Sequence, residues 1–177
     1  MARAGLTTRS RRFPGDERGA TMLEFAIIAV PFFGLMFGII EVAIVAWGTY
    51  ELENATQDAA RLIRTGQQSD QNKIKDEICR RTLLLGNCAE KLKLSAVSCQ
   101  ACTMVAPPSA LNEGKLNEAA FAAKQFSPGG ARDVVLVSAF YEWELVNFIT
   151  AYSIGNMENG NRLLQASAVF RNEPFPE

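Results

Sequence analysis

The 177-residue chain contains no histidine. This absence excludes a catalytic triad or a metal site that depends on imidazole. The sequence also lacks the Gly-x4-Gly-Lys-Ser/Thr loop that holds phosphates in nucleotide-binding proteins. Its acidic pair, Glu142 and Glu144, lies two residues apart in a segment rich in β formers, which is typical of a solvated strand face. We therefore expect a protein that is not an enzyme and that needs no cofactor or metal.

Charge is sparse and nearly balanced, with 18 Lys and Arg against 19 Asp and Glu and a net charge of −1. Nucleic-acid binding needs a concentrated basic surface, and the exported part of this sequence has none. The densest basic segment is the amino end, with Arg3, Arg9, Arg11, Arg12 and Arg18. We therefore expect no nucleic-acid partner.

Residues 25–47 form one long apolar run that only Glu41 interrupts. As a helix rising about 1.5 Å per residue, this run is long enough to cross a hydrocarbon layer of roughly 30 Å. It exceeds the apolar core of a signal peptide, about 7 to 15 residues. Five arginines precede the run, and only Arg61 and Arg64 follow within about 20 residues. The sequence predicts a single span in the lipid bilayer, with a cytoplasmic amino end and an exported remainder. Secretion after cleavage before Trp47 is the competing interpretation.

Two carboxylates belong to this segment, Glu24 at its entrance and Glu41 inside it. A carboxylate near the centre of a bilayer costs roughly 2.5 to 3.5 kcal/mol, so each needs a partner or access to water. Glu24 either pairs with a cation of a neighbouring subunit or reaches the cytosolic headgroups. Glu41 either faces a helix of another subunit or, in a tilted span, approaches the opposite headgroups with Trp47 and Tyr50.

Three small or rigid residues bear on how the span packs. Pro31 removes a backbone donor and predicts a kink. Gly34 and Gly38 form a small-xxx-small face that permits close approach of a second helix. We expect these residues, with Glu24 and Glu41, to take part in helix packing during assembly.

The entrance to the span reads Arg-Gly-Ala-Thr-Met-Leu-Glu-Phe, residues 18–25. Gly19 presents a peptide bond without an obstructing side chain to a protease at the membrane surface. The spacing of Gly19, Glu24 and Phe25 resembles the processing site of type IV prepilins, and glutamate followed by an aromatic is similar to the Tad (Flp) pilus family. The resemblance implies cleavage after Gly19 by a prepilin peptidase. Ala20 then gains a cationic amine, which can pair with Glu24 of a neighbouring copy.

Two further segments, residues 58–67 and 168–175, resemble TadE-like pseudopilins, whereas residues 101–130 match no known pattern. The resemblance implies a minor pseudopilin of the bacterial inner membrane that acts in Tad/Flp pilus assembly and can enter the pilus. Its implied partners are other pilins and pseudopilins and the inner-membrane assembly platform. The alternative is a single-pass, signal-anchored periplasmic binding or sensor domain with an uncut leader.

The helical pattern continues beyond the apolar run, with apolar and small residues at three- and four-residue steps up to Ile63. Gly66 supplies a stop. A second helix is predicted from a cap at Ser69 or Asp70 through Leu85, ending at Gly86-Asn87. Its apolar side carries Ile74, Ile78, Leu83 and Leu84.

Three segments predict a small antiparallel sheet. They are residues 91–96, in which apolar and polar residues alternate, residues 134–143, which are rich in β formers, and residues 162–171. Between the first two we expect a short helix over 111–126 and a turn over 127–130, as an insertion on the edge of the head. Residues 145–152 are predicted to form a short helix or loop before a turn at 155–160. The expected fold is α+β, a pilin-like long N-terminal helix packed on about three strands. Its parts are a leader (1–19), a transmembrane helix (20–48), an amphipathic continuation (49–66) and a periplasmic head (67–177).

All four cysteines lie in the part expected to be exported, where an oxidising compartment favours disulfides. Of the three possible pairings, proximity favours Cys79 with Cys88 and Cys99 with Cys102. A zinc site would have to consist of four thiolates, since there is no histidine. A redox pair would open a helix after a buried strand, whereas Cys99 and Cys102 lead toward Pro107-Pro108.

Overall fold

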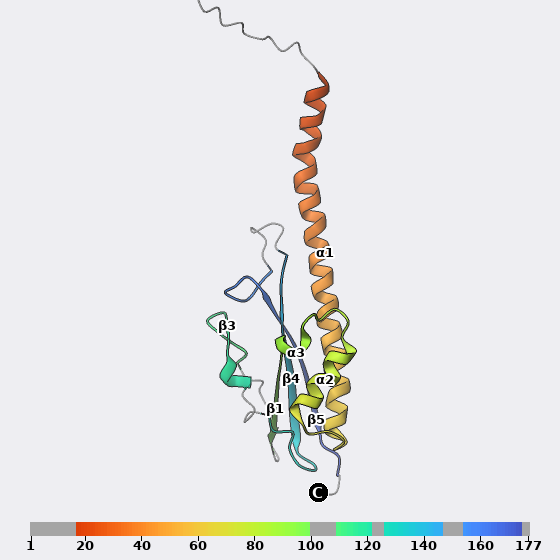
Figure 1. Cartoon of the computed structure of the whole chain (residues 1–177), viewed down its shortest axis with the longest axis vertical. Helices are drawn as coiled ribbons and strands as arrows, with labels where there is room; N and C mark the ends of the chain where they lie inside the picture. Colours follow the sequence, from red (N-terminus) through yellow and green to blue (C-terminus); the bar gives the residue numbers. More distant parts are fainter. Residues whose placement is uncertain (1–16, 100–108, 122–125, 147–153, 175–177) are drawn as a thin grey trace, which may run out of the picture. The chain divides into compact units, whose positions relative to one another are not determined.

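The computed structural model describes residues 17–99, 109–121, 126–146 and 154–174. They form the predicted α+β fold: helix α1 (Glu17–Arg64), a three-stranded antiparallel sheet and a small two-stranded sheet (Figure 1). The chain divides into two compact units, Met1–Phe37 and Gly38–Glu177. The second part of α1 therefore belongs to the same unit as the sheet, and the word head is kept for residues 67–177.

Within the unit Gly38–Glu177, α1 buries one face from Val45 to Ile63. The buried residues recur at three- and four-residue steps and are Val45, Leu52, Ala55, Thr56, Ala59, Ala60 and Ile63. Gly48 lies on the same face, and a Cβ there would lie 2.8 Å from the ring of Trp143. Small residues thus let the helix backbone approach the sheet closely.

Helix α1 ends in the glycine stop that the sequence predicts. Gly66 has φ +69°, the left-handed conformation that glycine adopts at little cost. Its N–H donates to the carbonyl of Ile63 (2.9 Å), and the N–H of Gln67 donates to the carbonyl of Leu62 (3.0 Å). These two bonds are those of a Schellman motif, which satisfies the last carbonyls of the helix.

Helix α2 (Gln71–Arg81) begins as predicted, because Oδ1 of Asp70 accepts a hydrogen bond from the N–H of Asn72 at 2.8 Å. Ile74 and Ile78 are fully buried. The predicted extension through Leu85 is wrong, since Thr82 is extended and its hydroxyl donates to the carbonyls of Ile78 and Cys79. Leu83, expected on the buried side, is 90% exposed.

The reason for this early end lies on α1. Oε2 of Glu51 accepts hydrogen bonds from the N–H groups of both Leu83 and Leu84, each at 3.1 Å. A carboxylate that accepts two backbone donors offers these amides a partner outside the helix. The chain therefore leaves α2 at Thr82 and crosses to the short helix α3 (Cys88–Lys91).

A disulfide joins Cys79 in α2 to Cys88 in α3, which confirms the first predicted pairing. Cys102, the partner predicted for Cys99, lies outside the described residues. The Cys79–Cys88 bond closes a short loop over a sequence separation of 9 residues.

Replacing both cysteines, Cys79→Ser with Cys88→Ser, is expected to lower the free energy of unfolding by about 2 to 3 kcal/mol, because the unfolded chain regains the freedom of that loop. Urea unfolding of wild type and variant in the same detergent, without reductant, measures the difference. Equal midpoints and equal slopes would contradict the expectation.

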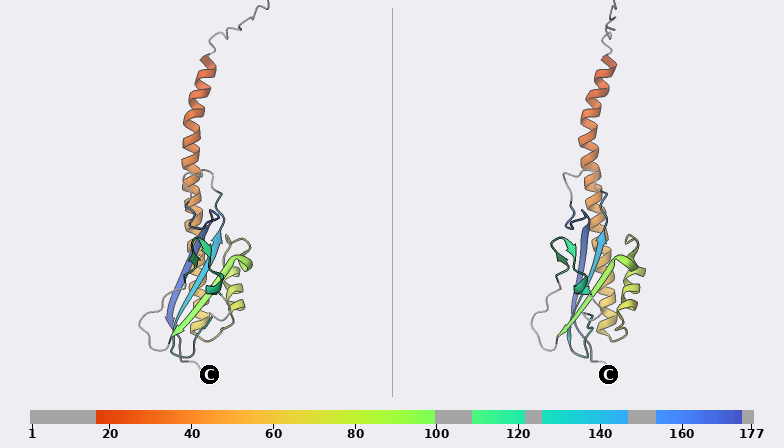
Figure 2. Two further views of the ribbon diagram at one scale, coloured as in Figure 1. Left: turned by 90° about the vertical axis from the view of Figure 1, so that its left-hand side faces the viewer. Right: turned by 60° about the vertical axis from the view of Figure 1, so that its left-hand side comes forward.

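The main sheet consists of β1 (Leu92–Cys99), β4 (Val134–Trp143) and β5 (Arg162–Arg171), in the order β1-β4-β5 and antiparallel throughout. Strands β4 and β5 coincide with predicted segments, and β1 overlaps the predicted 91–96 but continues to Cys99. The central strand β4 is covered on both faces, since alternate residues belong to different clusters. Val135, Val137 and Ala139 pack with α1 and α2, whereas Phe140 packs with Phe121 and Leu163 on the opposite face. The strands and the helices beside them can be followed in two further views (Figure 2).

The predicted helix over 111–126 is wrong in its described part. The chain forms a hairpin of β2 (Leu111–Asn112) and β3 (Lys115–Leu116), followed by the 3₁₀ helix η1 (Glu118–Phe121). Glu113 and Gly114 both have positive φ, at 51° and 80°, as a two-residue hairpin turn requires. Phe121 then lies on Phe140, with ring centroids 5.1 Å apart. The described insertion thus covers the second face of the sheet.

Candidate functional site

The residues of the predicted processing site all lie at the start of α1. The helix begins at Glu17, so Gly19 and Ala20 belong to its first turn and Glu24 and Phe25 to the turn after it. Gly19, Glu24 and Phe25 are exposed. A Cβ added to Gly19 would have nothing within 4 Å. The backbone at the predicted cleavage position is therefore open to approach.

The helix between this site and Glu41 exposes a continuous apolar surface. Its large exposed side chains are Met22, Leu23, Phe25, Ile27, Ile28, Val30, Phe32, Phe33, Leu35, Phe37, Ile39 and Ile40. Among the described residues, α1 is the one helix long and apolar enough to cross a membrane. It is thus the candidate span of a single-pass membrane protein.

Pro31 lies inside α1, which continues past it as one helix. Proline is tolerated in membrane helices where local adjustments satisfy the freed carbonyl. Gly34 is half-buried, whereas a Cβ at Gly38 would meet nothing within 4 Å. The small-xxx-small face thus has open space at Gly38, as close approach of a second helix requires.

Glu41 has a partner that sequence reasoning missed. Its Oε1 accepts a hydrogen bond from the backbone N–H of Val146, at 2.7 Å, although the two residues are 105 positions apart. Val146 follows the end of β4, and Glu41 is half-buried. A carboxylate inside an apolar run indicates that it has a hydrogen-bond partner, but the position of Glu41 in the sequence does not reveal which residue that partner is. The structure thus shows Glu41 holding the chain beyond β4 against α1.

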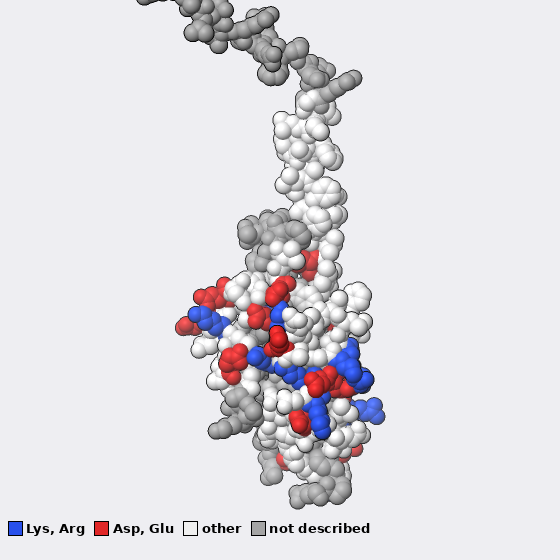
Figure 3. Space-filling view, in the orientation of Figure 1, with Lys and Arg blue, Asp and Glu red and all other residues white. Residues whose placement is uncertain are grey.

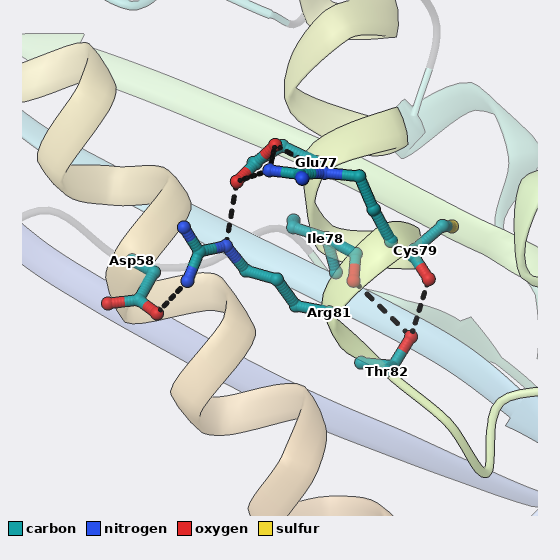
Figure 4. A network of polar contacts seen from close by, with 7 residues as sticks. Asp58, Glu77, Ile78, Cys79, Arg81 and Thr82 are labelled. Carbon is teal, nitrogen blue, oxygen red and sulfur yellow. Dashed lines mark hydrogen bonds and ion pairs between the residues drawn. The ribbon is translucent and has the colours of Figure 1, made fainter.

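A second polar link joins α1 to α2 through charged side chains (Figure 4). Arg81 donates to Asp58 on α1 (Nη1–Oδ2, 2.6 Å) and to Glu77 on α2 (Nε–Oε1, 2.7 Å), while Arg80 also donates to Glu77. The hydrogen bonds from Arg81 and then Arg80 lower the pKa of Glu77, and the bond to Glu77 is the main cause that raises the pKa of Arg81. Exposed pairs of this kind stabilise only weakly, so the network sets orientation more than stability.

Charges of both signs are mixed over the surface of the head (Figure 3). In the same view the apolar part of α1 shows no charged side chain.

A pocket of about 260 Å³ lies beside the Arg81 network and is lined by Asp58, Arg61, Leu62, Thr65, Gln67 and Arg81. Ligand pockets typically measure about 300 to 1,000 Å³, so this hollow is small for a ligand site. Within the described ranges, no three acidic or cysteine side chains are grouped to hold a metal ion.

Comparison with protein families finds a match to the family described as TadE-like protein, over residues 19–61. The resemblance to TadE-like proteins is confirmed over this segment. The TadE-like segment, residues 19–61, begins at Gly19 and ends three residues before the end of α1. No curated protein and no solved structure matches the chain.

The TadE-like segment contains every feature of α1 described above except its carboxyl end. It holds the open backbone at Gly19, the exposed Glu24, the apolar surface and the face that packs on the sheet. The sheet itself and the disulfide lie outside the match. The similarity is therefore confined to α1.

Proposed function

We propose that this protein is a minor pseudopilin of a Tad (Flp) pilus, made as an inner-membrane precursor and cleaved after Gly19 by a prepilin peptidase. The observation that carries the proposal is the TadE-like match, which begins at Gly19 and covers the whole apolar part of α1. In this proposal residues 1–19 are a cytoplasmic leader and 20–48 cross the membrane. Residues 49–66 continue the helix into a periplasmic head, 67–177.

Cleavage changes the charge at the membrane surface. Hydrolysis of the bond after Gly19 leaves a cationic amine on Ala20, one helical turn from Glu24, which is about 6 Å along the axis. The exposed Glu24 side chain is then available to the amine of a neighbouring helix. Pairing across helices offsets the cost of burying the carboxylate in hydrocarbon. Pro31, Gly34 and Gly38 belong to the same proposed assembly surface, whereas the carboxylate of Glu41 accepts a hydrogen bond from Val146 of its own chain.

The head supports a minor rather than a major role. Major pilins of the resembled family are very short, whereas this chain carries a sheet with two packed faces and a disulfide. Such a head favours a component that initiates or supports the filament. The partners in this proposal are other pilins and pseudopilins, the assembly platform and the prepilin peptidase.

Mass analysis of the intact protein, extracted from membranes of cells that contain the peptidase, tests the cleavage. We expect Ala20 as the first residue. Gly19→Val is expected to retain the leader, because a branched side chain obstructs the protease at an otherwise open backbone. Gly38→Val is the matched control, since a Cβ at either glycine meets nothing within 4 Å.

Two results would contradict the proposal and point elsewhere. An intact leader on the wild-type protein would favour the signal-anchored binding or sensor domain. A first residue near Trp47 would indicate ordinary secretion.

A further inference from the structure

The bond between Glu41 and Val146 places irregular backbone beside α1. Strand β4 ends at Trp143, and residues 144–146 have no regular secondary structure. Leu145 packs against the core, and the N–H of Val146 donates to Oε1 of Glu41. The side chain of Val146 is 69% exposed. A non-helical segment therefore lies on the helix at the level of Glu41, with an apolar side chain turned outward.

Irregular backbone that faces lipid does not occur inside the hydrocarbon layer, because its polar groups would lose their hydrogen bonds. The hydrocarbon must then end on α1 at or before Glu41. Residues 20–40 cover about 31 Å as a helix, which matches a hydrocarbon thickness of about 30 Å. Length and backbone geometry therefore agree on the same boundary.

We propose that, within the proposed span of residues 20–48, the part in the hydrocarbon ends at Glu41 and residues 42–48 lie at the level of the lipid headgroups. The head then rests on the bilayer with Val146 in the headgroup layer. This inference depends on the membrane span of the proposed function. The occupant of the exposed surface at Val146 is the lipid of the same bilayer, because Val146 contacts Glu41, whose neighbours Ile40 and Val42 are themselves exposed apolar side chains of α1.

Two neighbouring features fit a headgroup environment. Trp47 and Tyr50 are both exposed on α1 beyond Glu41, and Trp and Tyr are enriched at membrane–water interfaces. Nζ of Lys91 lies 2.6 Å from Oε1 of Glu144, two residues before Val146. This ion pair, which raises the pKa of Lys91, neutralises a carboxylate two residues from the proposed contact.

Tryptophan quenching by brominated lipids tests the boundary. The full chain is reconstituted in phosphatidylcholine vesicles with bromines either near the headgroup or near the chain ends. In a Trp47→Phe, Trp143→Phe background, Val146→Trp should lose most of its fluorescence, and more with bromines near the headgroup. Val169→Trp is the matched control, because Val169 is 65% exposed but lies near the end of β5, where the chain contacts Arg64. It should stay unquenched.

A third position separates failure of this inference from failure of the span. Phe32→Trp lies within residues 20–40 and should be quenched most by bromines near the chain ends. If Phe32→Trp is quenched and Val146→Trp behaves like Val169→Trp, the inference is overturned and the span stands. If Phe32→Trp is unquenched, α1 does not span and both fail. Cleavage after Gly19 is measured separately by mass.

A simpler variant guards against loss of folding in the doubly substituted background. Trp143→Phe alone leaves Trp47 as the reporter, and Phe keeps an aromatic ring against Gly48. The proposal expects Trp47 to be quenched less than Val146→Trp, since it lies about 9 Å beyond Glu41 along the helix. Stronger quenching of Trp47 than of Val146→Trp would overturn the proposed boundary.

A second copy of the chain is the other possible contact at position 146. In that case the fluorescence of Val146→Trp would change with the protein-to-lipid ratio and would not depend on the brominated lipid. This result would also overturn the proposal.

Discussion

Replacing Glu24 by alanine is expected to abolish pilus assembly while leaving the protein in the membrane. Glu24 is exposed on α1, one turn beyond the predicted amine of Ala20, and the side chains around it are apolar. Removing one partner of a buried ion pair costs about 3 to 5 kcal/mol, because the other charge stays buried and unpaired. A loss of about 3 kcal/mol corresponds to a factor of about 100 in an association constant. Counting pili by electron microscopy measures the effect.

Two further variants separate charge from shape. Glu24→Gln keeps the size of the side chain but loses its charge, so it should fail like Glu24→Ala. Glu53→Ala removes an exposed carboxylate from the part of α1 that packs on the sheet, and it should leave piliation normal. Normal piliation with Glu24→Ala, in cells where the wild-type gene is absent, would refute the proposed role of this carboxylate.

Replacing Phe140 by alanine is expected to lower the free energy of unfolding by about 3 to 5 kcal/mol. Phe140 is fully buried in the central strand β4 and lies between Phe121 and Leu163. Truncation leaves a cavity that the surrounding strands cannot close, and it removes the ring on which η1 packs. Urea unfolding of the full chain in detergent, followed by circular dichroism, measures the change.

The control for this substitution is Val169→Ala. Val169 lies on the neighbouring strand β5 but is exposed, so its truncation should change stability by less than about 0.5 kcal/mol. Phe121→Ala, which removes the facing ring, should cost less than Phe140→Ala, because Phe121 is at the edge of the cluster. If Phe140→Ala and Val169→Ala unfold at the same urea concentration, the cluster of Phe121, Phe140 and Leu163 contributes nothing to stability.

Features with a local physical cause were predictable from the sequence. Asp70 caps α2, Gly66 ends α1, and the three strands lie on segments that alternation or β formers predict. The Cys79–Cys88 pairing followed from short separation. Each of these depends on residues within about ten positions of one another. The resemblance to TadE-like proteins rested on the same kind of local spacing and is confirmed over residues 19–61.

Features set by distant contacts were not predictable in this way. The helical pattern of Leu83 and Leu84 favoured a longer α2, but Glu51 on α1 takes their backbone donors. The carboxylate of Glu41 is satisfied by an amide 105 positions away. The hairpin of β2 and β3 had a local signal in Gly114, which was outweighed by the helix-forming residues that follow it. Packing of Phe121 on Phe140 then selects the hairpin.

The end of the described chain is fastened to the end of α1. The N–H of Glu173 donates to the carbonyl of Arg64, and the Arg64 guanidinium binds the Glu173 carboxylate, both at 2.9 Å. Arg64 lies about 34 Å along the helix from Glu41. An epitope or fluorescent reporter attached beyond Glu173 therefore follows a residue held at the carboxyl end of α1, away from Glu41, and it offers a way to follow the protein in living cells.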